Sequence, residues 1–412
     1  MSPQDAWRPR RIGLYVHIPF CVQRCDFCAY KITAGTDLRD EMTAFVEMLK
    51  QEIRSVGRLA NVGSVELSVL FIGGGTPSML PIELMEQLLE CVTGQFRLAP
   101  DCEFTVECNP STTTKEKLRQ LRALGVNRLS IGVQSFDDHI LTEIGRDHSS
   151  ADARATFVNV RDEGFTNFNL DLMYRLPAQT RERLLQSVRS AVACGPTHLS
   201  LYPLWVRPGT RLHHRLQHGE VSIPDEASEF DMWRAAAELL TASGYRQYNV
   251  FDFTLNDESR SRYTFLQWED GEWIGVGPSA ISYVAGRHLT NAMSVREWSE
   301  RVTRFGVGTT GGAAVSRRAQ MHRTMIFGLR MMPFETARFE TQYGVPVDDV
   351  FGRELQLLKD LRLIERNDHQ IRLTAAGVQR INNISKFFYE QEDALQTLGI
   401  GRTGLPIEES DL

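Results

Sequence analysis

Between residues 14 and 204 the chain alternates short apolar runs with amphipathic stretches. The runs, of which Leu14–Ile18 is the first, have the length of buried strands, and the stretches between them carry apolar residues at helical spacing. Six such strand–helix units follow one another, which predicts a parallel sheet wrapped by its connecting helices. Six strands are too few to close an eight-stranded barrel, so we predict an α/β fold with a partial (β/α)6 TIM-like barrel.

The rest of the chain has a different pattern of apolar and polar residues. Residues 207–306 are irregular apart from one strong helix near 226–243, and we expect them to cover the open side of the barrel. After a glycine-rich stretch the pattern is helical to about residue 360 and ends in a hairpin and a further helix, which predicts a winged-helix-like domain. We therefore expect a barrel with a cysteine loop at 1–206, a covering segment at 207–306, a helical C-terminal domain at 307–390 and a flexible tail at 391–412.

Charge and hydrophobicity exclude several classes of protein. The chain of 412 residues has a formal net charge of −6, which argues against a protein that holds a nucleic-acid backbone by basic charge. No apolar run is long enough to cross a bilayer, and residues 1–10 contain no hydrophobic stretch of signal-peptide type. We therefore expect a cytoplasmic protein that binds neither nucleic acid nor a membrane.

Three of the seven cysteines, Cys21, Cys25 and Cys28, follow the first predicted strand with the spacing C-x3-C-x2-C. Three soft thiolates suit a [4Fe–4S] cluster, and they leave one iron without a protein ligand and open to a small molecule. The alternatives are a zinc site that lacks its fourth ligand, or three unrelated buried cysteines. Zinc sites usually present a second C-x2-C pair, which this sequence lacks, so we favour the cluster. The other four cysteines are expected to be core residues.

Glycine and polar residues end several of the predicted strands. Residues 73–76 (Gly-Gly-Gly-Thr) end the second strand, where consecutive glycines let the backbone approach a ligand closely, although an ordinary turn is the alternative. Glu107, Gln134 and Asp171 each end a later strand, the position at which barrel enzymes place functional side chains. One such residue alone is typical of a solvated loop, whereas three in succession favour a shared site.

The segment around the cysteines resembles the radical S-adenosylmethionine (SAM) superfamily, with Phe27 directly before the third cysteine. The resemblance implies a [4Fe–4S] cluster whose open iron is chelated by SAM. Further strings, such as Tyr15–Phe20, Glu107–Pro110 and Gly132–Phe136, are similar to the coproporphyrinogen dehydrogenase (HemN-like) branch, whose C-terminal domain the end of this chain resembles. By this resemblance the cluster and its SAM lie against Tyr15, Phe27, Gly73, Gly74, Gly75, Thr76, Glu107, Gln134, Arg146 and Asp171.

Two departures from the branch direct the functional prediction. The dehydrogenases carry a further cysteine where this chain has Tyr30, and the haem-chaperone relatives carry a histidine where this chain has Tyr263. The resemblance therefore favours the methyltransferases and cyclopropanases of the branch, which are thought to bind two SAM molecules. We predict a radical SAM enzyme that transfers a methylene group from a second SAM to an sp2 carbon of a conjugated or aromatic natural product, by C-methylation or cyclopropanation.

In this prediction Gly277 and Ile281 lie at the second SAM, and Tyr263 is a catalytic acid/base, with a core tyrosine as the alternative. The implied partners are the conjugated substrate, an electron donor such as flavodoxin or ferredoxin, and a separate methyltransferase-like protein. Two other functions stay open. One is tetrapyrrole chemistry, either coproporphyrinogen III decarboxylation or haem ring opening, and the other is a HemW-like haem chaperone, since tyrosine also ligates haem iron in some proteins.

Overall fold

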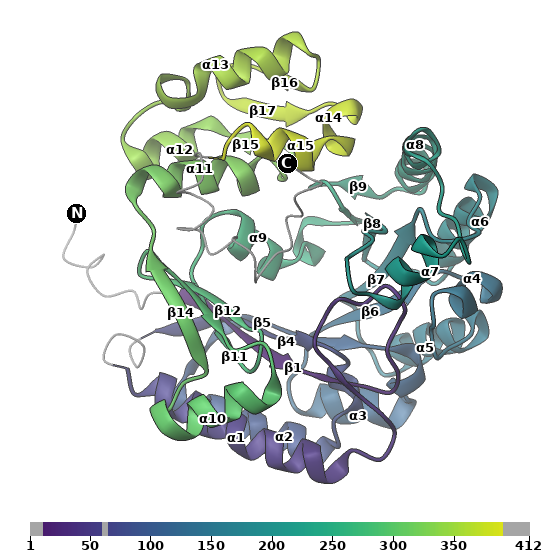
Figure 1. Ribbon diagram of the computed structural model, residues 1–412, viewed down its shortest axis with the longest axis vertical. Coiled ribbons are helices and arrows are strands. Elements are labelled where there is room, and N and C mark those ends of the chain that lie inside the picture. The colour runs from purple at the N-terminus through teal and green to yellow at the C-terminus, as the bar shows by residue number, and fades with distance from the viewer. Residues whose placement is uncertain (1–10, 60–64, 390–412) are drawn as a thin grey trace.

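The computed structural model describes residues 11–59 and 65–389, and the predicted tail at 391–412 lies outside them. The predicted α/β fold with a partial barrel is confirmed (Figure 1). The parallel strands of the barrel wall are β1 (Arg11–Ile18), β4 (Glu66–Gly74), β5 (Arg97–Cys108), β6 (Arg128–Gln134), β7 (Phe168–Tyr174) and β8 (His198–Pro203), in that order. The helices between them are α1 (Arg39–Gly57), α2 (Ile82–Gln95), α3 (Lys115–Ala123), α4 (Asp138–Glu143), α5 (Ser150–Asp162) and α6 (Arg181–Ala193).

The sheet continues past both edges of the barrel wall. Beyond β1 it adds the parallel strand β11 (Trp273–Val276) and then the antiparallel strands β12 (Ile281–Val284), β13 (Arg287–Asn291) and β14 (Thr309–Ala314). Beyond β8 it adds the antiparallel strands β10 (Asp252–Thr254) and β9 (Arg246–Gln247). Much of the segment 207–306 therefore extends the sheet itself, while the domain boundaries stay a prediction.

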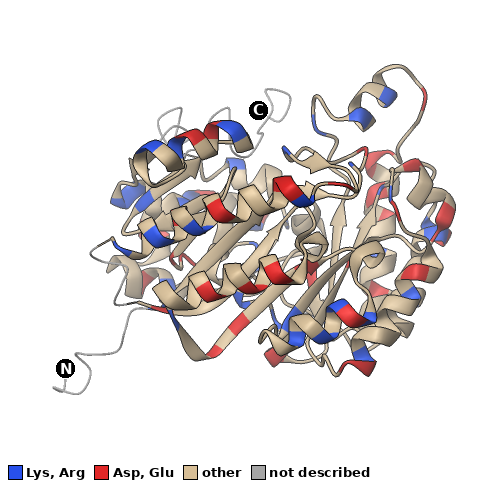
Figure 2. Ribbon diagram, turned by 90° about the horizontal axis from the view of Figure 1, so that it is seen from below, with Lys and Arg blue, Asp and Glu red and all other residues tan. Residues whose placement is uncertain are grey.

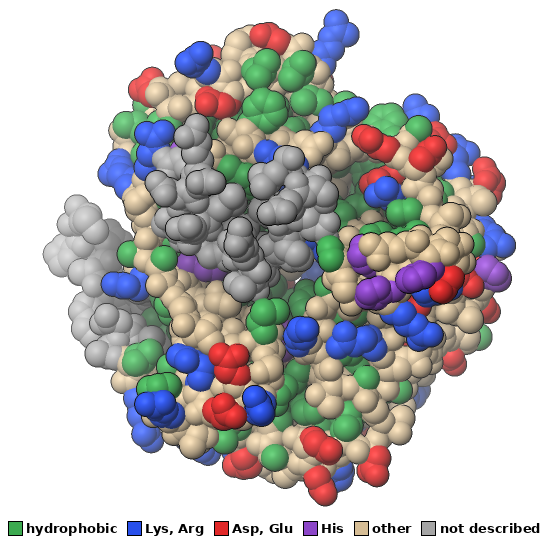
Figure 3. Space-filling model, viewed as in Figure 1, with side chains coloured by type: hydrophobic (Ala, Val, Ile, Leu, Met, Phe, Trp, Pro, Cys, Tyr) green, Lys and Arg blue, Asp and Glu red, His purple; other side chains and the backbone are tan. Residues whose placement is uncertain are grey.

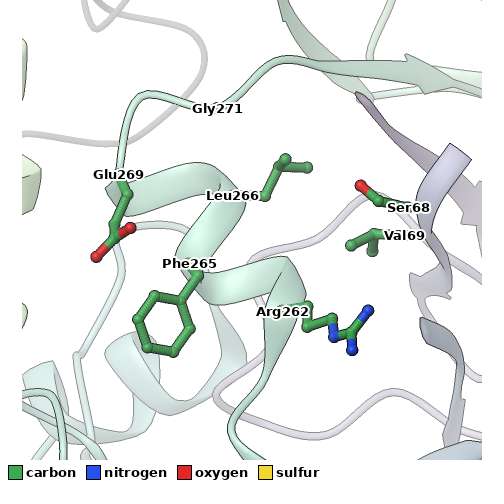
Figure 4. A pocket seen from close by; sticks show the side chains of 7 residues that line it. All are labelled: Ser68, Val69, Arg262, Phe265, Leu266, Glu269 and Gly271. Carbon is green, nitrogen blue, oxygen red and sulfur yellow. The ribbon is translucent and has the colours of Figure 1, made fainter. Parts of the chain in front are cut away.

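The remaining helices of this part are α7 (Arg211–Gln217), α8 (Glu226–Ala242), α9 (Arg262–Trp268) and α10 (Val295–Phe305). Helix α9 lies at the centre of the view, between the sheet and the C-terminal elements (Figure 1). Near the start of β1 it packs closely, since a Cβ atom on Gly13 would lie 2.3 Å from Cδ2 of Leu266. Beside that contact a pocket of about 270 Å³ lies between α9 and β4, lined among others by Val69, Phe265 and Leu266 (Figure 4).

The C-terminal elements pack as a helical layer with a small sheet, as predicted. The helices are α11 (Arg317–Gly328), α12 (Thr336–Tyr343), α13 (Val347–Asp360), α14 (Ala375–Gln379) and α15 (Ile381–Lys386). The strands β15 (Phe334–Glu335), β16 (Ile364–Arg366) and β17 (Gln370–Leu373) form a three-stranded antiparallel sheet in the order β15-β17-β16. The last two strands are the predicted hairpin.

The barrel helices are amphipathic, which explains how they cover the sheet. In α1 the buried residues Met42, Phe45, Leu49 and Ile53 recur every three or four positions and so share one face. Figure 2 shows charged residues of both signs along the helices, while the strands behind them carry few. Among the described residues, no helix combines the length and apolar character needed to cross a membrane.

Candidate functional site

The three cysteines lie in a loop that leaves the carboxyl end of β1. The loop begins at β2 (Phe20–Cys21) and ends at β3 (Thr33–Ala34), and these two short strands pair in parallel. Its middle is held by Asp26, whose backbone N–H donates to the carbonyl of Ile144 at 3.0 Å. The carboxylate of Asp26 accepts from Arg215 of α7 at 2.9 Å. Because Asp26 is only 4% exposed, this ion pair fixes the loop from its buried side.

Two polar side chains donate to the sulfur atoms of the loop. The hydroxyl of Thr76 lies 3.5 Å from Sγ of Cys21, and the guanidinium of Arg146 lies 3.3 Å from Sγ of Cys25. Burial, together with the nearby Cys28 and Cys25, raises the pKa of Cys21 to about 11, so the three sulfurs act on one another. A bound iron would supply the positive charge that keeps such thiols deprotonated.

The donor set of the loop fits an iron–sulfur cluster. Among the described residues, no three His, Cys, Asp or Glu side chains are arranged to hold a single metal ion. The fit therefore rests on chemistry: three free cysteines on one short loop, with two hydrogen-bond donors to their sulfurs. Sulfur ligands with donors around them are typical of iron–sulfur sites, where such hydrogen bonds tune the cluster.

The glycines after β4 let the cysteine loop pack against the sheet. A Cβ atom on Gly75 would lie 2.5 Å from the carbonyl oxygen of Phe20 and 3.0 Å from Sγ of Cys21, so a side chain there would displace the loop. Gly74 has φ of +114°, a conformation that favours glycine. Its backbone N–H donates to Oε2 of Glu107 at 2.8 Å, and Gly73 also faces that carboxylate. The glycine segment thus joins the cysteines to the polar interior.

The polar residues predicted at strand ends all belong to the barrel wall. Glu107 and Gln134 lie at the carboxyl ends of β5 and β6, as predicted, and the amide oxygen of Gln134 accepts from the hydroxyl of Tyr202 at 2.7 Å. Asp171 instead lies in the middle of β7, because that strand continues three residues beyond it, to Tyr174. Arg146 connects the group to the loop, since its guanidinium donates both to the carbonyl of Gly132 and to Cys25.

Burial changes the titration of both carboxyl groups in the interior. It raises the pKa of Glu107 to about 8, an effect that the donor on Gly74 opposes and that the neighbouring Asp171 reinforces. It raises the pKa of Asp171 to about 6, although the amide of Asn169 donates to that carboxylate at 2.7 Å. Strongly perturbed pKa values such as these cluster at functional sites.

Tyr263 stacks with two aromatic residues of the barrel wall. Its ring centroid lies 4.3 Å from that of Phe71 on β4 and 5.8 Å from that of Tyr15 on β1, with interplanar angles of 22° and 16°. Its hydroxyl accepts from Nε2 of Gln267 at 2.9 Å. We call Tyr15, Phe71 and Tyr263 the aromatic platform. Helix α9 thus brings Tyr263 to the same interior as the predicted SAM residues.

The other predicted cofactor residues lie at two edges of this region. Phe27 packs with a small apolar cluster that includes Ile144 and Leu212 and so anchors the loop beside Asp26. Gly277 follows β11 with φ of +94°, and a Cβ atom there would lie 2.6 Å from the carbonyl oxygen of His17. Ile281 begins β12, and its carbonyl accepts from the indole of Trp273. The second SAM predicted at Gly277 and Ile281 stays a prediction.

Several residues of this region were not predicted from the sequence. Phe71 looked like one more apolar strand residue, although the alternation along β4 places it on the side of the sheet that Tyr15 faces. Asn169 holds Asp171 and also contacts Nδ1 of His198 at 2.7 Å, and Nε2 of His198 lies 2.8 Å from the hydroxyl of Tyr248. Two of these residues, His198 and Tyr248, come from later segments of the chain, so no local pattern around Asp171 indicates them.

The raised pKa of Glu107 predicts that the cofactor-free protein becomes less stable as the pH rises. An unfolded glutamate ionises near pH 4.3, whereas Glu107 in the folded chain holds its proton to about pH 8. Between these values the folded state binds more protons, so the free energy of unfolding falls as the pH increases. Urea unfolding at pH 5 and pH 8 measures this. The loss should be smaller in Glu107→Gln, and equal losses in the two proteins would contradict the assignment.

Comparison with known proteins places the sequence among relatives of two kinds. Residues 15–191 match the radical SAM superfamily and residues 315–380 match the HemN C-terminal domain. The heme chaperone HemW of Bacillus subtilis is 32% identical over 88% of this chain and 95% of its own length. The heme chaperone HemW of Escherichia coli is 35% identical over 68% of this chain and 72% of its own length.

A solved structure shares the whole fold. Coproporphyrinogen III oxidase (HemN) from Escherichia coli, a radical SAM enzyme, superposes with a TM-score of 0.80 at 27% identity, covering 92% of this chain and 90% of that chain. These relatives contradict the prediction of methylene transfer, and with it the prediction of a C-methyltransferase or cyclopropanase acting on a natural product. The error came from weighing two single positions, Tyr30 and Tyr263, above the agreement of the chain as a whole.

Proposed function

This chain belongs to the HemN-like branch of the radical SAM superfamily, and on that premise we propose that it binds haem and delivers it to other proteins. The observation that carries the proposal is the similarity to the heme chaperone of Bacillus subtilis, which covers 95% of that protein's length. In this proposal the cysteine loop carries a [4Fe–4S] cluster with SAM, and haem is the cargo. The domain boundaries, the cytoplasmic location, the electron donor and a second SAM are further proposals that rest on the family resemblance.

The residues around the cysteine loop have separable roles in this proposal. Cys21, Cys25 and Cys28 supply the thiolate ligands, and the bound cluster supplies an open iron to which SAM attaches. Thr76 and Arg146 stabilise the thiolates by donating to Sγ of Cys21 and Cys25. Asp26 and Arg215 hold the loop in place, and the raised pKa of Glu107 allows its carboxyl group to donate a hydrogen bond near neutral pH.

The aromatic platform supports the haem part of the proposal. Haem is a flat conjugated ring, and such rings pack well on aromatic side chains in an apolar setting. The Tyr263 ring lies nearly parallel to Phe71 and Tyr15, so the three present one stack to the barrel interior. The platform comes from β1, β4 and α9, and none of it belongs to the cysteine loop. Haem binding therefore requires no residue that ligates the cluster.

Haem titration tests the proposal. Full-length protein is titrated with ferric haem, and we expect saturation at one haem per chain. Tyr263→Ala, which removes part of the platform, should weaken binding by about tenfold or more, since a stacked aromatic pair is worth about 1 kcal/mol beyond its buried area. Phe305→Ala is the matched control, because Phe305 lies on α10 and is 55% exposed. Equal affinity in all three proteins would indicate nonspecific adsorption and contradict the proposal.

Tetrapyrrole decarboxylation is the second candidate, favoured by the superposition on coproporphyrinogen III oxidase. Against it, Tyr30 stands where the decarboxylases carry a further cysteine. Anaerobic incubation of the cluster-loaded protein with SAM, reductant and coproporphyrinogen III separates the two candidates. Loss of carbon dioxide from the substrate would support decarboxylation, whereas haem uptake without turnover of the porphyrinogen would support the carrier.

A further inference from the structure

His17 is a buried histidine with one ring nitrogen that has no partner among the described residues. Its side chain is 2% exposed, and its Nδ1 lies 2.9 Å from the hydroxyl of Tyr15. Its Nε2 is buried and makes no hydrogen bond. Nearly all buried polar groups in proteins are paired, so an unpaired nitrogen at this depth indicates a ligand that binds there.

The surroundings of His17 distinguish it from the other unpaired histidines, His148 and His213. His148 lies beside Asp147, and His213 belongs to α7, over which histidine side chains gather on the surface (Figure 3). His17 instead lies two residues from Tyr15 on the same side of β1, with ring centroids 5.9 Å apart. Its imidazole is therefore the nearest ring to the aromatic platform that carries a nitrogen.

Two more contacts define the faces of the imidazole. A Cβ atom on Gly74 would lie 2.7 Å from the ring, so the ring lies directly against a backbone that carries no side chain. On another side the ring of Tyr30 lies 6.2 Å away, and Tyr30 is 58% exposed. Tyr30 belongs to the cysteine loop, so on that side the imidazole faces a loop residue rather than a strand of the barrel.

The chemistry of His17 suits a metal-bound macrocycle. Burial lowers the pKa of His17 to about 4, so the ring is neutral at pH 7. A neutral imidazole is a common axial ligand of haem iron, and its basicity and orientation are set by the group that its other nitrogen contacts. Here that group is the hydroxyl of Tyr15: when Nδ1–H donates to the phenol oxygen, the lone pair of Nε2 is free to coordinate.

We propose that Nε2 of His17 is the axial ligand of the haem iron in this chain. Helix α9 presents a phenol at Tyr263, and β1 supplies an imidazole at His17, two residues from Tyr15 of the same platform. The nitrogen lone pair forms the bond to iron, the proton stays on Nδ1, and no oxidation state changes. The inference rests on the proposed haem binding and names the atom that holds the cargo.

Resonance Raman spectroscopy of ferrous haem bound to full-length, cluster-loaded protein tests this assignment. The native protein should show the iron–histidine stretching band, and His17→Ala should lose it and recover an axial imidazole when free imidazole is added. His322→Ala, which removes a buried histidine of the C-terminal elements, is the matched control and should keep the band. Tyr15→Phe should keep the band while weakening haem affinity by about 10- to 100-fold, as other losses of a ligand's hydrogen-bond partner do.

The haem spectrum of a His17→Met variant and a measurement of SAM binding distinguish loss of the axial ligand from other effects of the substitution. His17→Met places a thioether at the same position, and a change to the spectrum of thioether-ligated haem would support the assignment even if His17→Ala fails to fold. An iron–histidine band that survives in both His17 variants overturns it, as does a loss of SAM binding with an unchanged haem spectrum. Absence of haem binding in the native protein would instead refute the proposed function itself.

Discussion

Replacing Cys21, Cys25 or Cys28 with alanine is expected to remove the iron–sulfur cluster completely. Each cysteine supplies one thiolate to a different iron of a [4Fe–4S] cluster, and the loop has no other cysteine that can take its place. An iron that loses its only protein ligand is exposed to water and is released, after which the cluster falls apart. Iron and sulfide analysis of anaerobically reconstituted protein, with the visible absorption of the cluster, measures the loss.

The four other cysteines provide matched controls for this experiment. Cys91 lies in α2 and Cys194 follows α6, and both are buried among core residues. Cys91→Ala and Cys194→Ala each remove a thiol from the same barrel but outside the cysteine loop, so they should keep full iron content. A cluster that persists in Cys25→Ala, or that is lost equally in Cys91→Ala, would contradict the assignment of the ligands.

The cysteine variants also separate the cluster from the haem site. The aromatic platform and His17 lie on β1, β4 and α9, outside the cysteine loop. We therefore expect Cys28→Ala, which lies farthest along the chain from β1, to bind haem with the native affinity. Joint loss of cluster and haem would show that the loop contributes to the haem site.

Much of the fold was predictable because its signals are local. Each barrel strand is an apolar run of strand length followed by an amphipathic helix, and such units pack as a parallel sheet. The spacing of the cysteines, and the positions of Glu107 and Gln134 at the ends of their strands, required no knowledge of distant residues. The pairing of β11 with β1 is different, because it joins segments some 260 residues apart and has no signature in either of them.

The aromatic platform could not be predicted for the same reason. Tyr15, Phe71 and Tyr263 each fit an ordinary core residue, and only the position of α9 inside the barrel makes them a stack. For His17 the sequence contains only a weak indication. It is a polar residue between Val16 and Ile18, which lie on the fully buried face of β1, so its side chain is expected on the opposite face. The functional prediction set haem binding aside because of one side chain. The absence of a histidine at position 263 excludes only one way of holding haem iron.

Replacing Glu52 with alanine is expected to lower the free energy of unfolding by about 3–5 kcal/mol, because each buried hydrogen-bond donor left without a partner costs about 1–3 kcal/mol. Glu52 lies on the apolar face of α1, three residues after Leu49, and is 1% exposed. Its carboxylate accepts four hydrogen bonds, from the backbone of Gly277 and Gly308 at 2.7 Å each and from Trp298 and Asn291 at 2.9 and 3.0 Å. Alanine leaves all four donors buried and unpaired.

The consequence reaches the candidate site because Gly277 packs against the backbone of His17. Urea unfolding gives the free energy, and Glu47→Ala is the matched control: Glu47 lies on the exposed side of the same helix, where it pairs with Lys50 at 2.6 Å. Its loss should cost less than about 1 kcal/mol, as for other exposed ion pairs. An unfolding free energy in Glu52→Ala close to that of Glu47→Ala would contradict the proposed role of this carboxylate.

Glu52→Gln tests whether the site requires two oxygen atoms that accept hydrogen bonds, rather than a negative charge. Each carboxylate oxygen of Glu52 accepts from two donors, so an amide group in its place points an NH2 at two of them whichever way it rotates. We therefore expect this nearly isosteric change to destabilise the protein by a substantial part of the alanine effect, with haem affinity reduced in parallel. Full stability in Glu52→Gln would mean that the carboxyl group is protonated and donates in the native protein, and that one of the four contacts is not a hydrogen bond.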